Sequence, residues 1–259
     1  MSKKPYLGLW LLLATAFCIV CIVAFIDDIK IGTYTVKKAP LADVLTAEAG
    51  ANDSTAVLPD SLVNLKESVE TDSLPQVFLI FGDSMTYNLA LRLAQYAKQN
   101  GHEIHSVNWD SSNTKIWADH DTLAYFINKY HPTQIFISLG SNELYLKQPD
   151  LRRPQVKKIL EVIDTIPYIW IGPPNWTEDS GINDMIASEC KPGSFFRSAG
   201  MEFKRKKDGI HPTRESSALW IDSVMRWLPK SAHPFRADIP SDTIGKANPG
   251  IIYLKALNK

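Results

Sequence analysis

Residues 76–86 read Gln76-Val77-Phe78-Leu79-Ile80-Phe81-Gly82-Asp83-Ser84-Met85-Thr86. The apolar run that ends at Phe81 is too short for a core helix and is rich in β-forming residues. It therefore predicts a strand buried on both faces of a sheet. From Thr86 the leucine and alanine spacing becomes helical, and Asn100-Gly101 is a typical helix stop. Ser84 is thus predicted to lie on a strand-to-helix turn.

This position suits a nucleophile. Open α/β sheets place their sites at the carboxyl edge of the strands. A helix amino terminus also presents backbone N–H groups and the positive end of the helix dipole, both of which stabilise a developing oxyanion. The alternative interpretation is that Ser84 only caps the helix.

The rest of residues 75–229 alternates between strand-like and helix-like segments, which predicts a parallel sheet with helices on both faces. Further strands are expected at 102–108, 134–139 and 168–171, and helices at about 123–130, 154–163, 182–190 and 214–228.

The amino-terminal residues have a different character. Lys3 and Lys4 precede an apolar segment, residues 6–26, which is long enough to cross a bilayer as a helix. No small-x-small cleavage site precedes Asp27. Because positive residues before a span stay in the cytoplasm, we expect residues 1–28 to be an uncleaved anchor in the cytoplasmic membrane, with the catalytic domain periplasmic or otherwise extracytoplasmic. A cleaved signal peptide is the alternative.

Residues 29–74 are interpreted as a stalk, because their composition shifts to small and polar residues. Within them, residues 29–36 alternate weakly and form either a short strand or none. A flexible coil of this length reaches about 35–40 Å on average. Residues 230–259 contain several prolines and are expected to be a tail that wraps the domain or stays loose.

Composition excludes some classes of protein. The chain has 259 residues with 22% charged and 45% hydrophobic residues, as in ordinary globular proteins, and its net charge of +0 gives no electrostatic case for nucleic-acid binding. Cys190 is the only cysteine outside the apolar segment, so a cysteine-based zinc site is not expected. Residues 119–121, Asp-His-Asp, are interpreted as a solvated helix start. Neither a metal nor a cofactor is predicted.

Two later stretches supply partners for Ser84. Gly140-Ser141-Asn142-Glu143 follows a predicted strand, so it should reach the same edge of the sheet, where the Asn142 amide can donate to an oxyanion. A common Asn/Gly turn is the alternative. Asp208-Gly209-Ile210-His211 places a carboxylate three residues before a histidine, the usual base for a serine nucleophile.

Together these stretches resemble the GDSL/SGNH hydrolase family over residues 75–229. Gly82-Asp83-Ser84 matches its first block, Gly140-x-Asn142 its third, and Asp208-x-x-His211 its last. The resemblance implies a flavodoxin-like three-layer α/β/α fold with a central parallel sheet of about five strands. It also implies Ser84 as nucleophile, His211 as base and Asp208 as its orienting acid, with the oxyanion held by the Ser84 N–H and the Asn142 amide.

One block departs from the family. Its second block normally supplies a glycine whose N–H joins the oxyanion hole, but residues 109–114 read Trp-Asp-Ser-Ser-Asn-Thr. The backbone N–H of Ser111 or Ser112 can take that place, and we expect Ser112. Trp109 and Trp176 fall on predicted rim loops, where they could stack on substrate or simply pack.

The resemblance implies a serine ester hydrolase, and the apolar segment at residues 6–26 adds the expectation that it is exported and membrane-anchored. The mostly polar rim loops and the stalk favour short acyl groups, acetyl above all, on cell-envelope polysaccharide or peptidoglycan. The alternatives are an O-acyltransferase with a carbohydrate acceptor, a lipase or thioesterase, and an inactive binding module. The intact motifs argue against the inactive module.

Overall fold

The computed structural model describes residues 15, 29–31, 34–36 and 71–257. The predicted anchor at 6–26, apart from Thr15, and most of the predicted stalk lie outside these residues. Within the described ranges, no helix is both long and apolar enough to cross a membrane. The chain divides into two units, Met1–Leu65 and Lys66–Lys259.

The described part of the first unit is a pair of short strands. β1 (Ile29–Ile31) pairs antiparallel with β2 (Tyr34–Val36), and Ile29 lies opposite Val36. The weak alternation at residues 29–36 therefore corresponds to two strands, where the sequence predicted at most one.

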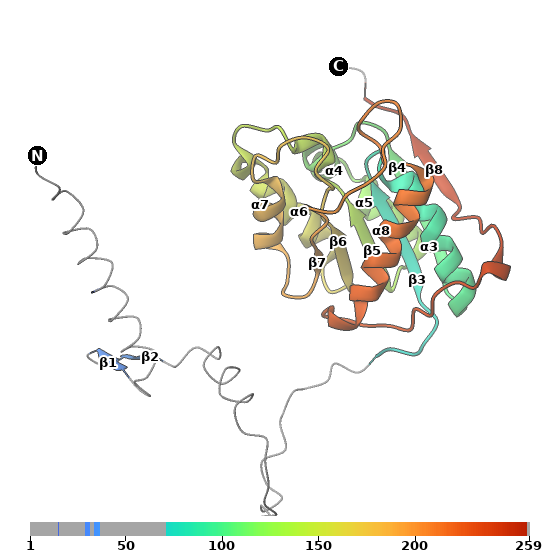
Figure 1. Ribbon diagram of the computed structural model, residues 1–259, viewed down its shortest axis with the longest axis horizontal. Coiled ribbons are helices and arrows are strands. Elements are labelled where there is room, and N and C mark those ends of the chain that lie inside the picture. Colours follow the sequence, from blue (N-terminus) through green and yellow to red (C-terminus); the bar gives the residue numbers. More distant parts are fainter. Residues whose placement is uncertain (1–14, 16–28, 32–33, 37–70, 258–259) are drawn as a thin grey trace, which may run out of the picture. The chain divides into compact units, whose positions relative to one another are not determined.

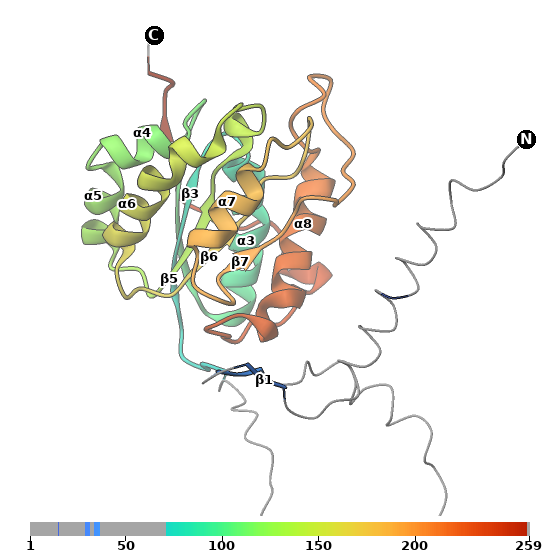
Figure 2. The same cartoon turned by 90° about the vertical axis from the view of Figure 1, so that its left-hand side faces the viewer.

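The second unit has three layers, with helices on both faces of a sheet (Figures 1 and 2). Over residues 71–257 the sheet has six strands, all parallel, in the order β7-β6-β5-β3-β4-β8. The strands are β3 (Val77–Gly82), β4 (Glu103–Trp109), β5 (Gln134–Ser138), β6 (Tyr168–Ile171), β7 (Phe195–Phe196) and β8 (Ile251–Leu254). The helices are α3 (Thr86–Asn100), α4 (Thr114–Asp119), α5 (Thr122–Tyr130), α6 (Arg153–Ile163), α7 (Ile182–Glu189) and α8 (Arg214–Trp227). Short 3-10 helices are η1 (Ser141–Glu143), η2 (Pro149–Arg152), η3 (Leu228–Lys230) and η4 (Asp242–Ile244).

The strand order explains where a site can form. Read from β4, the order across the sheet is β4, β3, β5, β6 and β7. Numbered from the first strand of this unit, β3, this is the order 2-1-3-4-5, which is typical of flavodoxin-like folds. The chain leaves β3 toward one side of the sheet and leaves β5 toward the other. In such sheets a crevice opens at the carboxyl ends of the two strands where the direction reverses. The predicted flavodoxin-like parallel sheet is therefore confirmed, with six strands in place of about five.

The predicted two-sided burial of the first strand is also confirmed. Phe78 and Ile80 pack into a core with residues of α3 and α8, whereas Leu79 and Phe81 pack into a second core with residues of α4 to α7. All four side chains are fully buried. The alternation of side chains along a strand thus turns one unbroken apolar run into the centre of two cores.

The carboxyl-terminal residues belong to the sheet. β8 pairs in parallel with β4, and Ile252 lies opposite Val107. At the other end of the strands, the Asp72 N–H donates to the Pro234 carbonyl at 2.9 Å. The structure therefore extends the domain to both sides of the predicted limits at 75 and 229. A four-residue edge strand carries too weak a periodicity to be recognised without its partner.

The end of β3 contains a glycine that no other residue can replace without displacing backbone. Gly82 pairs with Ser138 on β5, and a β-carbon built on it would lie 1.9 Å from the Ser138 carbonyl oxygen. Its φ of 156° is also one that side chains rarely allow. Glycine is therefore required at position 82 if β3 and β5 are to stay paired up to their carboxyl ends.

We expect Gly82→Ala to destabilise the domain by about 3 kcal/mol or more, because the added methyl meets backbone that cannot move aside. Denaturant titration followed by circular dichroism measures the change. The control is Gly101→Ala at the end of α3, where φ is 72° but the space is open. It should cost only about 1–2 kcal/mol. Equal losses in the two variants would contradict the close contact.

Candidate active site

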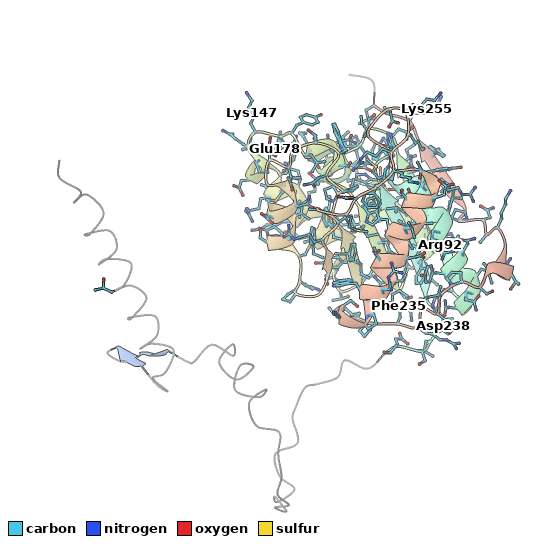
Figure 3. All side chains as sticks on the ribbon, in the orientation of Figure 1. Arg92, Lys147, Glu178, Phe235, Asp238 and Lys255 are labelled. Atoms are coloured by element: carbon cyan, nitrogen blue, oxygen red, sulfur yellow. The ribbon has the colours of Figure 1, made fainter. Side chains whose placement is uncertain are left out.

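The loops that follow the parallel strands meet at one edge of the domain. Lys147 and Glu178, which come after β5 and β6, and Lys255, which follows β8, lie along that edge (Figure 3). Phe235 and Asp238 lie at the opposite edge (Figure 3). Ser84 and Asn142 follow β3 and β5, so both stand at the crevice where the strand order reverses.

Ser84 lies in a tight turn that is stabilised by three hydrogen bonds of the preceding residue, Asp83. The Asp83 N–H donates to the Ser138 carbonyl at 3.1 Å, and its carbonyl accepts from the Thr86 N–H at 3.0 Å. Its Oδ1 accepts from the Met85 N–H at 2.9 Å. Among the described residues, the Ser84 N–H donates to no acceptor, so it remains available to an oxyanion beside the start of α3.

A chain of hydrogen bonds joins Ser84 to His211 and Asp208. Ser84 Oγ lies 2.7 Å from His211 Nε2, and His211 Nδ1 lies 2.9 Å from Asp208 Oδ2. The second oxygen of Asp208 accepts from the backbone N–H groups of His211, at 2.9 Å, and Ile210, at 2.8 Å. The structure therefore brings together the three residues that the first and last motifs predicted.

The protonation states follow from these contacts. The hydrogen bond from the His211 ring, with the two backbone N–H donors, lowers the pKa of Asp208 to about 2. Asp208 is then a carboxylate at neutral pH and can only accept. The proton of a neutral His211 must therefore sit on Nδ1, which leaves the Nε2 lone pair to accept from the Ser84 hydroxyl. This is the arrangement that a general base requires.

The loop that carries His211 folds back on itself. The Lys206 N–H donates to the His211 carbonyl at 2.7 Å, and Arg205 pairs with Pro212 in an isolated bridge. The Arg205 guanidinium also donates to the carbonyls of Ile210 and Asn175. Arg205 therefore fixes the backbone next to His211 against the loop that follows β6. The basic run at residues 204–207 includes at least one structural residue.

Asn142 lies in η1, directly after β5. One N–H of its amide donates to the Ser112 carbonyl at 2.8 Å, which leaves the second N–H for another acceptor. The preceding carbonyl, of Ser141, accepts from the Trp176 indole at 3.0 Å. Asn142 is therefore fixed from two sides, and its amide is oriented before any substrate binds.

Glu143, which the sequence analysis did not single out, ties this loop to the next one. Its buried carboxylate accepts from the N–H and the hydroxyl of Thr114 at 3.0 and 2.7 Å, and from Arg152 Nε at 2.8 Å. Thr114 begins α4, so the contact joins the loop after β5 to the loop after β4. No local pattern announces these partners, because they lie 29 and 9 residues away.

The predicted role of Ser112 conflicts with its contacts. Its N–H donates to the Trp109 carbonyl at 3.1 Å, and its buried hydroxyl accepts from the Trp117 indole at 2.9 Å. The Ser112 N–H is occupied because it closes a tight turn. Ser111 sits within that turn with a φ of 57°, in the left-handed region that favours glycine. Its N–H donates to no described residue, so of the two candidate donors Ser111 is the one whose N–H is available.

The two predicted aromatic contacts with substrate differ in outcome. Trp109 is only 5% exposed, packs against Trp117, and donates its indole N–H to the Lys255 carbonyl at 3.0 Å. Trp109 therefore packs in the core and holds the end of β8, which agrees with the packing alternative. Trp176 is half-buried next to Asn142 through its bond to Ser141.

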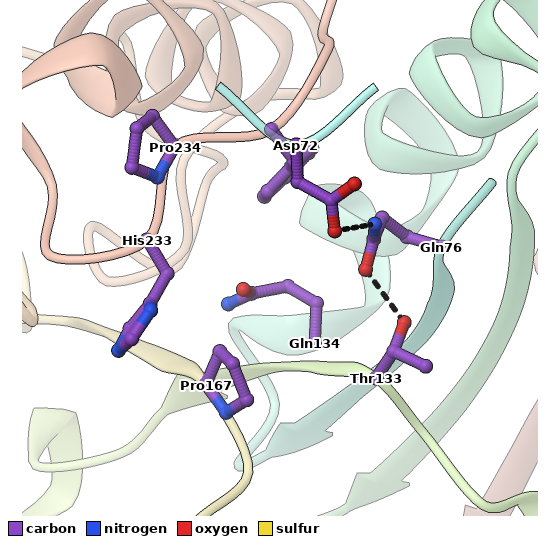
Figure 4. A pocket seen from close by; sticks show the side chains of 8 residues that line it. Asp72, Gln76, Thr133, Gln134, Pro167, His233 and Pro234 are labelled. Atoms are coloured by element: carbon purple, nitrogen blue, oxygen red, sulfur yellow. Dashed lines mark hydrogen bonds between the residues drawn. The ribbon is translucent and has the colours of Figure 1, made fainter. Parts of the chain in front are cut away.

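Two other features lie apart from this site. A cavity of about 200 Å³ opens at the amino ends of β3, β5 and β6, beside Asp72, Gln134 and His233 (Figure 4). It contains none of the predicted site residues. Cys190 is a free, partly buried cysteine, and burial raises the pKa of its thiol to about 12, which suppresses its reactivity. No group of three or more metal-binding side chains occurs within the described residues.

Fold and site together define a doubly wound α/β domain with a serine–histidine–aspartate site at its switch point. No protein-family model matches the chain, and no curated protein matches it either. Among solved structures, the chain is similar to a protein assigned to the G-D-S-L family of lipolytic proteins from Desulfitobacterium hafniense DCB-2. The identity is 14% and the TM-score 0.43, over 59% of this chain and 99% of that one. A gut microbial diltiazem-metabolizing enzyme is similar at 9% identity and a TM-score of 0.33, over 65% of this chain and 38% of that one.

Asp83 should make the stability of the domain depend on pH. Its carboxyl is fully buried, and desolvation raises its pKa from 3.8 to about 7, with a smaller contribution from Glu143. Between these values the folded chain keeps the proton and the unfolded chain loses it. The free energy of unfolding should therefore fall by a few kcal/mol as the pH rises from 4 to 7, and level off above 7.

Asp83→Asn, which is neutral at every pH, should remove this decline. Urea titrations of both proteins at pH 4, 5.5 and 7 measure it, and the difference between the two curves isolates the one carboxyl. Parallel curves would show that Asp83 is ionised in the folded domain throughout this range.

Proposed function

We propose that the domain is a serine ester hydrolase. The observation that carries the proposal is the continuous path from Asp208 through His211 to Ser84, with the Asn142 amide fixed on the neighbouring loop. A serine, its base and the group that orients the base stand in hydrogen-bond contact at the edge where open α/β sheets hold their ligands.

The chemistry follows from the positions of the protons. His211 Nε2 takes the proton of Ser84 as Oγ attacks the ester carbonyl. The negative charge that develops on the carbonyl oxygen is stabilised by the Ser84 N–H and the free N–H of Asn142. His211 then gives its proton to the leaving alcohol, and an acyl group remains on Ser84. Water attacks this acyl group, passes a proton through His211 to Ser84, and releases the acid.

The acceptor of the acyl group is proposed to be water. Transfer to a sugar hydroxyl would use the same residues. However, the side chains of His211 and Asp208 are 28% and 43% exposed, which gives water direct access to the base. A transferase has to exclude water from this intermediate.

We propose short acyl groups, acetyl above all, on a carbohydrate of the cell envelope as substrate. The loops that carry Ser111, Asn142 and Thr177 are mostly polar, which suits a hydrated sugar better than an acyl chain. Export and a membrane anchor at residues 6–26 belong to the same proposal, and the apolar segment after Lys3 and Lys4 supports them.

Ser84→Ala should lower ester turnover by about 10⁴–10⁶, because the nucleophile is removed. Hydrolysis of p-nitrophenyl acetate by the purified protein measures it. Ser223→Ala, a serine on α8 that is partly buried like Ser84, is the matched control and should leave the rate unchanged. Asn142→Ala should lower kcat by about 10²–10³ with a smaller change in KM. An active Ser84→Ala protein would overturn the proposed function.

The length of the acyl chain tests the substrate class separately. We expect kcat/KM for p-nitrophenyl esters to be highest with acetyl and to fall as the chain lengthens toward octanoyl. Each buried CH₂ would add about 0.8 kcal/mol of binding only if an apolar channel received it. A kcat/KM that rises steadily with chain length would favour a lipase or thioesterase.

A further inference from the structure

Two pairs of aromatic side chains lie near the catalytic edge, and three of the four rings are exposed. Tyr87 and Tyr253 are 36% and 54% exposed, with ring centroids 5.7 Å apart. Tyr145 is 66% exposed and approaches Trp176, with ring centroids 6.4 Å apart. Clustered apolar groups that remain in contact with water mark binding surfaces more often than single exposed residues do.

The first pair is built beside the nucleophile. Tyr87 lies in the first turn of α3, three residues after Ser84. Tyr253 lies on β8 opposite Asn108, and the next residue, Leu254, accepts a hydrogen bond from the Asp110 N–H at 3.0 Å. The carboxyl-terminal strand thus brings Tyr253 against Tyr87 of α3, and the residue after Tyr253 holds the loop that contains Ser111.

The second pair lies on the other side of Ser84. Tyr145 follows Asn142 by three residues, and Trp176 is in the loop after β6. In the strand order, β5 and β6 lie on one side of β3, whereas β4 and β8 lie on the other. β6 and β8 are four strands apart, which at about 4.8 Å per strand is about 19 Å. The residues near these pairs are likewise separated along the edge, with Lys147 and Glu178 at one end and Lys255 at the other (Figure 3).

We infer that these pairs are two sugar-binding platforms, and that the substrate is a polysaccharide chain that lies across the strand ends with its ester at Ser84. The inference rests on the proposed function, which it makes more specific. The C–H groups on the faces of a sugar ring pack against aromatic faces, while tyrosine hydroxyls and the nearby Asp110 carboxylate bind sugar hydroxyls. The strands next to the outer rings, β6 beside Trp176 and β8 with Tyr253, are about 19 Å apart, a spacing that suits several linked sugars better than a single one.

The inference predicts that the protein prefers a polymeric substrate to a small one. The wild-type protein should hydrolyse O-acetylated chitohexaose with a higher kcat/KM than O-acetylated N-acetylglucosamine. Tyr253→Ala and Tyr145→Ala should each lower kcat/KM for the hexasaccharide by about 3–10-fold, mainly through KM. Because the two pairs are far apart, the double variant should lose about 10–100-fold. All these variants should keep the wild-type rate on p-nitrophenyl acetate.

The controls distinguish a platform from a structural role. Tyr253→Phe retains the ring and should keep most of the hexasaccharide activity, and Tyr125→Ala removes a similarly exposed tyrosine from α5. Trp176 is left intact because its indole holds Ser141 beside Asn142. Thermal unfolding shows that each variant is folded. A wild type without preference for the hexasaccharide, or variants that lose both substrates equally, would overturn the inference. Either result leaves the proposed function standing, since that depends on Ser84→Ala and p-nitrophenyl acetate.

Discussion

The close approach of β3 and β5 is the constraint on which the site depends. A β-carbon at Gly82 would lie 1.9 Å from the Ser138 carbonyl oxygen, so only glycine lets the two strands run together to their ends. The chain leaves β3 toward one edge of the sheet and β5 toward the other, which opens a crevice between the two departing loops. Ser84 and Asn142 stand on those loops. The contact that joins the strands therefore also places the loop of Ser84 next to the loop of Asn142.

Two buried carboxyl groups stiffen this crevice by different means. Glu143 is surrounded by donors from Thr114 and Arg152, so its burial is compensated and it holds the loops after β4 and β5 together. Asp83 shapes the turn at Ser84 but has one oxygen without a hydrogen-bond partner among the described residues, and desolvation raises its pKa to about 7. Burial thus favours the neutral form of this carboxyl, next to Ser84, at pH values below about 7. A carboxylate there would repel the developing oxyanion.

Features that depend on only a few consecutive residues could be predicted from the sequence. The strand at Phe78–Phe81 and the Asp208–His211 pair belong to this class, because periodicity and short spacing reveal them. The sequence did not reveal contacts between distant segments. The indole of Trp109 bonds to Lys255, 146 residues away, so its rim position could not show that it points into the core. The preference for Ser112 failed for a similar reason, since only the turn geometry shows that its N–H is occupied.

The carboxyl-terminal strand and the serine in the turn after β4 are two parts of one arrangement. Ser111 takes a φ of 57°, which costs a side-chain-bearing residue about 1–2 kcal/mol relative to glycine. The flanking residues are held by the end of β8: the Asp110 N–H donates to Leu254, and the Trp109 indole donates to Lys255. These bonds resist relaxation of the turn and so offset the strain of the serine. A turn that glycine would adopt by its own freedom is held here by the end of β8, and that strand also carries an aromatic ring, Tyr253, to the catalytic edge.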